Sequence, residues 1–286
     1  MQTVSPYVSG LGDAQKNLTK SPQFDISVIR SNTAARLEEA RAFGTQLSQD
    51  SKILDVGCGI GDNVDVLCSM GYDAYGIDIF EYWGRDFEKY WEDRPRPQGA
   101  HLSKLYVVDS ADYRLPFPDG YFDLALSSET FEHIYNYTDV FREIARVLKP
   151  GAISINIFAG GHQLREEHIN VPIPRLCNYK TWLIIWALLG RRSSRQRGLG
   201  WRETVAANVE MMRIAHYPSM IALHRFAEQG RVRIEFASAR RLVLKATGRF
   251  PQLTKHWPRL LKYVLATAAS VFYLDRYMLI YGKGRH

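Results

Sequence analysis

Short apolar runs alternate with amphipathic segments through the first 160 residues. Helical spacing of apolar positions predicts helices from residue 31 or 32 to about 48, over 63–70 and over 138–148. The last of these ends at Pro150-Gly151, a typical helix stop. Strands are expected at five mostly apolar runs: 52–56, 74–79, 105–109, 122–127 and 152–158. Strands that alternate with helices predict a doubly wound α/β fold around a parallel sheet.

The pattern changes after residue 160. Residues 161–230 are expected to be mostly helical, with a basic loop at 191–197. A further apolar helix is expected near 259–274. Apolar segments at 232–236 and 278–281 predict a sixth and a seventh strand, which would complete the sheet.

Two apolar runs and the number of cysteines indicate the expected cellular location of the protein. The runs at 182–189 and 264–274 are shorter than the roughly 20 residues that a membrane-spanning helix needs. They are interpreted either as helices of the core or a substrate tunnel, or as segments that dock on a membrane interface. The first residues show no apolar stretch typical of a signal peptide, and three cysteines give no disulfide framework. A cytoplasmic protein is therefore expected, with membrane association left open.

Charge is distributed unevenly along the chain. Residues 1–150 hold 15 Lys+Arg and 23 Asp+Glu, whereas residues 151–286 hold 22 and 7. The basic half could meet an anionic substrate, a nucleic acid or an anionic membrane, or it could be a solvated arginine-rich surface.

A glycine-rich turn follows the first predicted strand. Gly57, Gly59 and Gly61 come directly after Asp55, and Asp78 lies near the end of the second strand. Glycines let a backbone approach a ligand closely, and a carboxylate at the second strand can accept hydrogen bonds from ribose hydroxyls. The spacing is not the dinucleotide pattern G-x-G-x-x-G. The turn therefore indicates a nucleoside that carries an amino-acid group.

Four motifs in order resemble the class I S-adenosylmethionine-dependent methyltransferases, of the methyltransferase type 11 kind. They are LDVGCGIGD (54–62), YGIDI (75–79), the segment 107–134 and FREIARVLKPGA (141–152). The resemblance covers about residues 35–160. It implies a Rossmann-like α/β fold with a seven-strand sheet, an N-terminal helical arm and a helical C-terminal cap. The domains would be a flexible arm (1–31), an S-adenosylmethionine-binding core (32–160) and an acceptor cap with the last strands (161–286).

The resemblance also assigns cofactor contacts. The three glycines would lie against the methionine part, and Asp55 would orient its amino group. Asp78, followed by Ile79, would bind the ribose. Either Asp109 or Asp112 would contact the adenine. Ser127, after the fourth strand, would lie near the methionine end.

The segment after the fourth strand carries the candidate catalytic residues Glu129, Glu132 and His133. Three interpretations stay open. His133 could be a general base that Glu132 or Glu129 orients, with His168 as the second choice of base. The three residues could instead bind a divalent metal such as Mg²⁺ with His162 or His168, because E-x-x-E-H resembles the pattern of ubiquinone-pathway and small-RNA methyltransferases. The cluster could also be structural.

The long cap alternates basic and apolar segments, and this pattern indicates the chemical class of the acceptor. It favours a small-molecule, glycan or lipid-linked acceptor with an anionic group that arginines would meet. The preference for O-methylation rests only on the possible general base. The alternatives are an RNA methyltransferase, disfavoured because no RNA-binding module is recognisable, and a catalytically inactive scaffold. Peripheral membrane contact is left open, and nothing in the sequence indicates the oligomeric state.

Overall fold

A computed structural model describes most of the chain from residue 26 onward. The residues that it describes are 26–59, 61–79, 102–159, 165–166, 168–173, 176–193, 196–215, 217–244, 254, 256–272 and 276–283. Most of the predicted flexible arm and His162 lie outside these ranges.

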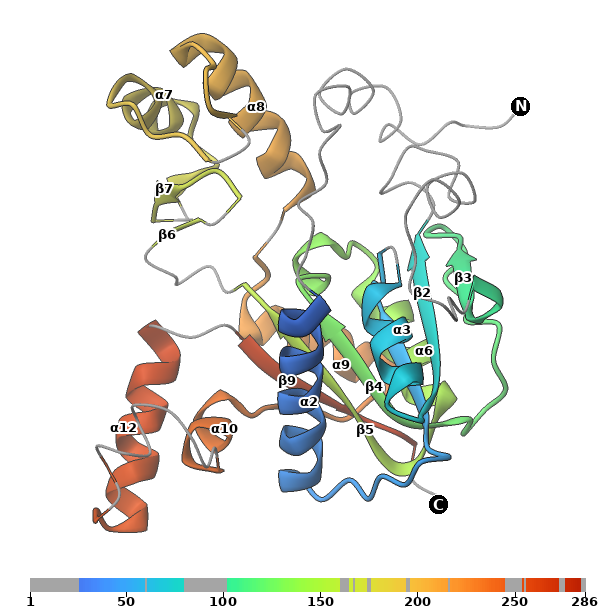
Figure 1. Ribbon diagram of the computed structural model, residues 1–286. Coiled ribbons are helices and arrows are strands. Elements are labelled where there is room, and N and C mark those ends of the chain that lie inside the picture. The colour runs from blue at the N-terminus through green and yellow to red at the C-terminus, as the bar shows by residue number, and fades with distance from the viewer. Residues whose placement is uncertain are drawn as a thin grey trace.

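Seven strands form one mixed sheet, in the order β3-β2-β1-β4-β5-β9-β8 (Figure 1). Neighbours from β3 to β5 are parallel, and β9 runs antiparallel between β5 and β8. The expected Rossmann-like α/β fold with a seven-strand sheet is therefore confirmed. The strands are β1 (Lys52–Val56), β2 (Asp73–Ile79), β3 (Leu105–Val108), β4 (Phe122–Ser128), β5 (Leu148–Phe158), β8 (Ile234–Phe236) and β9 (Arg276–Tyr281).

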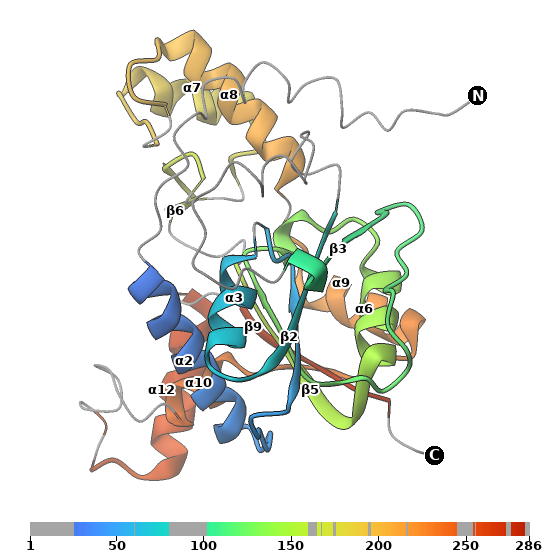
Figure 2. The same cartoon turned by 45° about the vertical axis from the view of Figure 1, so that its right-hand side comes forward.

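Helices cover both faces of the sheet (Figure 2). Leu37 and Leu67 join one buried cluster with β4 and β5, whereas Phe141 and Leu223 join the cluster on the opposite face. Glu39 accepts hydrogen bonds from Arg241 and Tyr277 and so ties the first helix to the C-terminal part of the chain. The first face carries α2 (Ile26–Ala42), α3 (Asp62–Ser69), α10 (Ser238–Leu244) and, packed on α10, α12 (Arg259–Phe272); the second carries α6 (Tyr137–Val147) and α9 (Met220–Gly230).

The segment between β5 and α9 packs around a small apolar core of its own. Ile169, Val171, Cys177 and Leu183 are buried there, and Trp182 packs against them. This cap lies beyond the edge at which β2 ends (Figure 1). It consists of the hairpin β6 (Arg165–Glu166) and β7 (Val171–Pro172), with α7 (Lys180–Leu188) and α8 (Trp201–Ile214).

Several predicted boundaries were wrong. Helix α2 begins at Ile26, inside the predicted arm, and ends at Ala42 because Gly44 takes a left-handed conformation (φ +98°) that closes it. Strand β5 begins at Leu148, so Pro150 and Gly151 lie within a strand. The hairpin β6–β7 interrupts a segment expected to be mostly helical.

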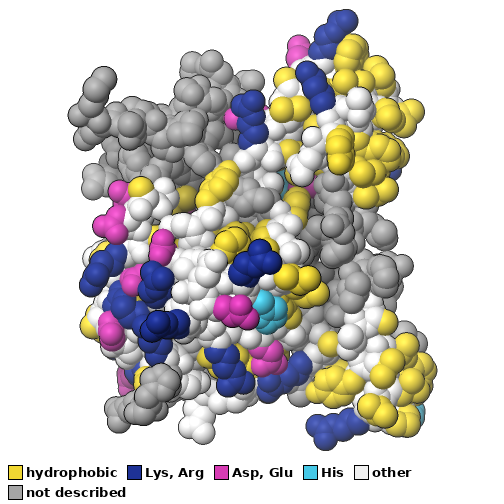
Figure 3. All heavy atoms as spheres, turned by 180° about the vertical axis from the view of Figure 1, so that it is seen from behind, with side chains coloured by type: hydrophobic (Ala, Val, Ile, Leu, Met, Phe, Trp, Pro, Cys, Tyr) yellow, Lys and Arg dark blue, Asp and Glu magenta, His cyan; other side chains and the backbone are white. Residues whose placement is uncertain are grey.

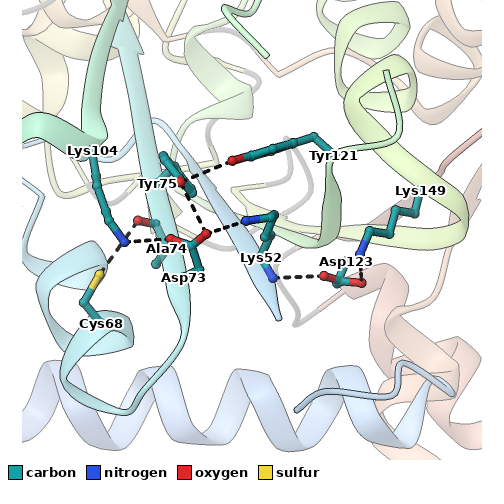
Figure 4. A network of polar contacts seen from close by, with 9 residues as sticks. All are labelled: Lys52, Cys68, Asp73, Ala74, Tyr75, Lys104, Tyr121, Asp123 and Lys149. Atoms are coloured by element: carbon teal, nitrogen blue, oxygen red, sulfur yellow. Dashed lines mark hydrogen bonds and ion pairs between the residues drawn. The ribbon is translucent and has the colours of Figure 1, made fainter. Parts of the chain in front are cut away.

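Charged residues gather at the edge where the parallel strands begin (Figure 4). The Asp73 carboxylate pairs with Lys52 at 2.6 Å and with Lys104 at 2.7 Å. Burial alone would raise the pKa of Asp73, but the two lysines lower it overall. Asp123 accepts the backbone N–H of Lys52 and pairs with Lys149. Ion pairs occupy this edge of the sheet. The edge formed by the carboxyl ends of the parallel strands is therefore the one available to a ligand.

Among the described residues, no helix is long and apolar enough to cross a membrane.

Candidate active site

The order of the strands locates the candidate site. The chain runs from β1 outward to β3, then returns to form β4 on the other side of β1. In open α/β sheets, ligands bind at the carboxyl ends of the strands at such a reversal. The glycine-rich turn follows β1 there, and the segment 129–133 follows β4. The fold therefore brings the two predicted motifs together.

Gly57 is the point of closest approach between them. Its φ is +75°, and a Cβ built on it would lie 2.1 Å from Oγ1 of Thr130. The Thr130 hydroxyl lies 3.0 Å from the Ser128 carbonyl oxygen, to which it donates. A residue with a side chain cannot fit at position 57 without moving Thr130. Sequence reasoning did not single out Thr130, although it lies inside the segment of candidate catalytic residues.

Asp78 holds the middle of the glycine turn. One carboxylate oxygen accepts the Gly59 N–H at 2.7 Å, and the other accepts the Ile79 N–H at 2.7 Å. Asp78 thus fixes the turn against the end of β2.

Asp55 lies buried at the end of β1. Burial raises the pKa of its carboxyl to about 6, and the negative charge of Asp78 adds to this. The charge of Arg36 and a hydrogen bond from Asn63 act in the opposite direction. Oδ1 of Asn63 accepts from the Thr33 hydroxyl at 2.5 Å, which directs its amide N–H₂ toward Asp55. Arg36 and Thr33 both lie on helix α2, so this helix helps to keep the Asp55 carboxyl ionised.

The two candidate adenine contacts differ in their surroundings. Asp109 accepts the Ala111 N–H at 2.8 Å and so belongs to the turn that follows β3. Asp112 is exposed. Tyr113 follows Asp112 in the chain. Burial, and then the charges of the Asp78 and Glu143 carboxylates, raise the pKa of its hydroxyl. Tyr113 was not predicted, and a tyrosine in this loop gives no sequence signal of its own.

Ser127 lies in the middle of the sheet, between Val56 of β1 and Asn156 of β5. It is completely buried, and its hydroxyl has no hydrogen-bond partner in the described part of the chain. The Ser128 hydroxyl is in the same state. Buried polar atoms of this kind usually mark a ligand or water site.

The candidate catalytic residues cluster with a histidine from the cap. Ligand atoms of Glu132, His133 and His168 all lie within 4.8 Å of one another. Glu132 is completely buried, and the two imidazole rings meet edge to face with centroids 5.6 Å apart. Glu129 lies outside this trio and is exposed, with a left-handed backbone (φ 50°) that is rare for a residue with a side chain.

A buried carboxylate in the cap holds His168. Nδ1 of His168 lies 2.7 Å from Oε1 of Glu166, which also accepts from the Tyr217 hydroxyl. The second oxygen accepts the Ile169 N–H at 2.8 Å. Burial alone would raise the pKa of Glu166, but His168 and these hydrogen bonds lower it overall. Glu166 is therefore ionised at neutral pH and fixes which nitrogen of His168 faces His133.

Sequence reasoning named His168 as a candidate fourth metal ligand and as the second choice of general base, and it missed Glu166 and Tyr217. The glutamate and histidine are neighbours in a polar loop, which gives no strong pattern. Tyr217 is distant in sequence, and only the folded cap brings it to the site.

Known proteins are similar in sequence to part of this chain. A family model described as a methyltransferase domain matches residues 54–155. Sterol 24-C-methyltransferase ERG6B of Gibberella zeae is 33% identical over 120 residues, covering 42% of this chain and 30% of that protein. The chloroplastic tocopherol O-methyltransferase of Arabidopsis thaliana is 33% identical over 135 residues (44% and 37%). Norajmaline N-methyltransferase of Rauvolfia serpentina is 32% identical over 132 residues (44% and 44%).

Each match spans less than half of the relative's length. The names of the three relatives describe transfer to carbon, oxygen and nitrogen, so likeness in the core does not distinguish between acceptor atoms.

Proposed function

We propose that this chain, whose residues 54–155 match a methyltransferase domain model, transfers a methyl group from S-adenosylmethionine to a small acceptor. The observation that carries the proposal is the glycine turn, which Asp78 holds at the reversal of the strand order and which lies against Thr130, three residues before His133. Methyl transfer from a sulfonium is an in-line displacement, for which alignment of donor and acceptor is the main requirement.

The cofactor is proposed to lie along the carboxyl ends of β1, β2 and β4. Its methionine part would lie against Gly57, Gly59 and Gly61, with the amino group toward Asp55 and near the buried Ser127 hydroxyl. Its ribose would donate to the Asp78 carboxylate at the end of β2. The adenine would lie between Ile79 and the loop that follows β3. Asp109 and Asp112 both stay candidates for the adenine contact, because the Ala111 N–H occupies only one oxygen of Asp109.

Replacing Asp78 with alanine is expected to weaken S-adenosylmethionine binding by about 1–3 kcal/mol, because charged hydrogen bonds to the ribose and the anchor of the turn are both lost. Calorimetric titration measures the change. Asp73→Ala is the matched control, since Asp73 lies on the same strand at the opposite edge of the sheet. Unchanged affinity in Asp78→Ala, or an equal loss in the control, would remove Asp78 from the site.

Cofactor affinity is expected to fall as the pH drops below about 6. The raised pKa of Asp55 means that the free protein protonates this carboxyl below about pH 6, and a neutral carboxyl attracts the cofactor amino group less. The loss would approach about tenfold per pH unit below that pKa. Titrations across this range test it, with Asp55→Asn as the control that should show a flat profile. A wild-type profile as flat as that of Asp55→Asn would contradict the assignment.

The acceptor is proposed to bind between the histidine pair and the cap. His168, held by Glu166, is the proposed general base, with His133 and Glu132 beside it. A base favours an acceptor hydroxyl, which supports O-methylation. The basic cap favours an acceptor with an anionic group, which a glycan or lipid-linked metabolite can carry.

A divalent metal in the same cluster is the second candidate, because three ligand atoms within 4.8 Å can share one ion. Two imidazoles and one carboxylate suit Mn²⁺ or Zn²⁺ better than Mg²⁺, which prefers oxygen ligands. When bound, such an ion would polarise the acceptor oxygen. Activity that is lost in EDTA and restored by Mn²⁺ would favour the metal, whereas EDTA-resistant activity would favour the base.

Transfer of a labelled methyl group tests the whole proposal. The purified chain is incubated with methyl-labelled S-adenosylmethionine and panels of phosphorylated or carboxylated sugars, their lipid-linked forms, and RNA. Label in a base-stable ether of a small acceptor is the expected result. Label in RNA would support the RNA alternative, and cofactor binding without transfer to any panel would support the scaffold alternative.

A further inference from the structure

Helix α12 turns its apolar face outward. Trp257, Leu260, Leu261, Val264 and Leu265 are all exposed, with Leu260 at 78%. Their spacing places them on one side of the helix, and the buried Ala266 lies on the side that packs against α10. A surface helix normally buries such a stripe. The stripe on α12 therefore lacks a partner within the described chain.

Helix α7 of the cap shows the same feature. Ile185, Leu188 and Leu189 are exposed at its C-terminal half, with Leu189 at 67%. Tyr179, just before the helix, is exposed as well. The opposite side of α7 supplies Leu183 to the small core of the cap. The cap is thus packed on one side and apolar on the other.

The two apolar faces lie on the same side of the molecule. Helices α7 and α12 lie at its upper and lower left in Figure 1. Seen from behind, yellow side chains gather at the upper and lower right, where these helices lie (Figure 3). Two separate patches that face the same way fit a partner with a broad, flat surface better than a narrow ligand that would bind in a single groove.

The charge of the segments around α7 and α12 indicates which kind of partner this surface binds. Residues 168–202, around α7, and residues 237–274, around α12, each contain seven Lys+Arg and no Asp or Glu. Lys180 and Arg191 flank α7, and Arg259 and Lys262 lie on α12. Exposed leucine and tryptophan beside lysine and arginine are typical of helices that lie in the interface of an anionic bilayer. A nucleic-acid phosphate backbone offers no apolar surface against which the exposed leucines could pack. RNA is therefore disfavoured as the partner of this surface.

We propose that the exposed faces of α7 and α12 form one docking surface that binds the chain peripherally to an anionic lipid bilayer. Leucine and tryptophan side chains would enter the headgroup boundary, and the lysines and arginines would meet the lipid phosphates. This inference does not depend on methyl transfer, because binding to lipid can be measured without cofactor or acceptor.

Sedimentation with vesicles tests the proposal on the full chain. Vesicles of phosphatidylcholine with phosphatidylglycerol are expected to carry the protein down, and vesicles of phosphatidylcholine alone are expected to bind it at least about tenfold more weakly. Raised salt should also weaken binding. No binding to the mixed vesicles, or equal binding to both kinds, would overturn the proposal.

Charged substitutions locate the surface. Leu188→Glu and Leu260→Glu are each expected to lower vesicle affinity by about tenfold, because each removes an exposed leucine that would enter the bilayer and adds a negative charge. Ile221→Glu is the matched control: Ile221 is 74% exposed on α9, which covers the other face of the sheet, and its variant should bind like wild type. Thermal melts confirm that each variant is folded. Equal losses in all three variants would overturn the assignment.

Light scattering tests whether the surface binds a second copy of the chain instead of a membrane. If the chain forms a dimer in the absence of lipid and Leu260→Glu makes it monomeric, the face covers a second copy of the chain, and the membrane proposal is wrong. A wild-type monomer that binds mixed vesicles is the expected result.

Discussion

Replacing His168 with alanine is expected to lower turnover by about 100-fold or more, because a positioned general base commonly contributes that much. The affinity for S-adenosylmethionine should stay unchanged, since His168 lies in the cap and not in the glycine turn. Single-turnover rates at saturating cofactor, together with cofactor titrations, measure the two effects separately. His133→Ala is expected to lower turnover as well, with little change in cofactor binding.

Glu166→Gln separates positioning from catalysis. Glutamine can still accept a hydrogen bond from His168, but it lacks the negative charge that stabilises a protonated imidazole. We expect a loss in turnover of about tenfold, smaller than that of His168→Ala, together with a changed pH profile that a purely structural role would not give. His224→Ala is the matched control, because His224 lies on α9 against Phe236 and away from the cluster. Full activity of His168→Ala would contradict the assignment, and if only His133→Ala is inactive, His133 is the base.

Replacing Gly57 with alanine is expected to weaken S-adenosylmethionine binding by more than about 100-fold, which corresponds to about 2.7 kcal/mol. Two effects add. A side chain at φ +75° is strained by about 1 kcal/mol, and the new methyl group must displace Thr130 from the turn that receives the cofactor. Calorimetric titration measures the affinity, and a thermal melt shows how much stability is lost.

Gly44→Ala controls for the strain alone. Gly44 also has a left-handed φ, of +98°, but no atom lies within 4 Å of a Cβ built there. This variant should lose about 1 kcal/mol of stability and keep its cofactor affinity. Equal affinities for wild type and Gly57→Ala would show that the cofactor does not lie against this turn.

The parallel core could be predicted because its signals are local. Strand β1 was predicted at its observed bounds, since a central strand buried on both faces is a short, mostly apolar run. The glycine turn is equally local: Asp55 lies in this strand, and Gly57 directly follows it. Helix α2 was misplaced because its apolar positions give a weak pattern, and Gly44 was not recognised as its stop.

The cap and its part of the site could not be predicted, because they depend on contacts between distant residues. Tyr217 and Glu166 are 51 positions apart in sequence. The hairpin that carries Glu166 has strands of two residues, too short for any periodicity. Arg192, expected to meet an anionic acceptor, donates instead to the carbonyl oxygens of Ala187 and Leu199 and so holds its own loop.

Calorimetric titration of the folded chain with S-adenosylmethionine and S-adenosylhomocysteine tests the central claim most directly. The account predicts that each ligand binds once per chain with a micromolar dissociation constant, about −8 kcal/mol, and that Gly57→Ala abolishes this heat while Gly44→Ala keeps it. No binding of either ligand to a chain that melts cooperatively would contradict the proposal that this turn holds a methyl donor.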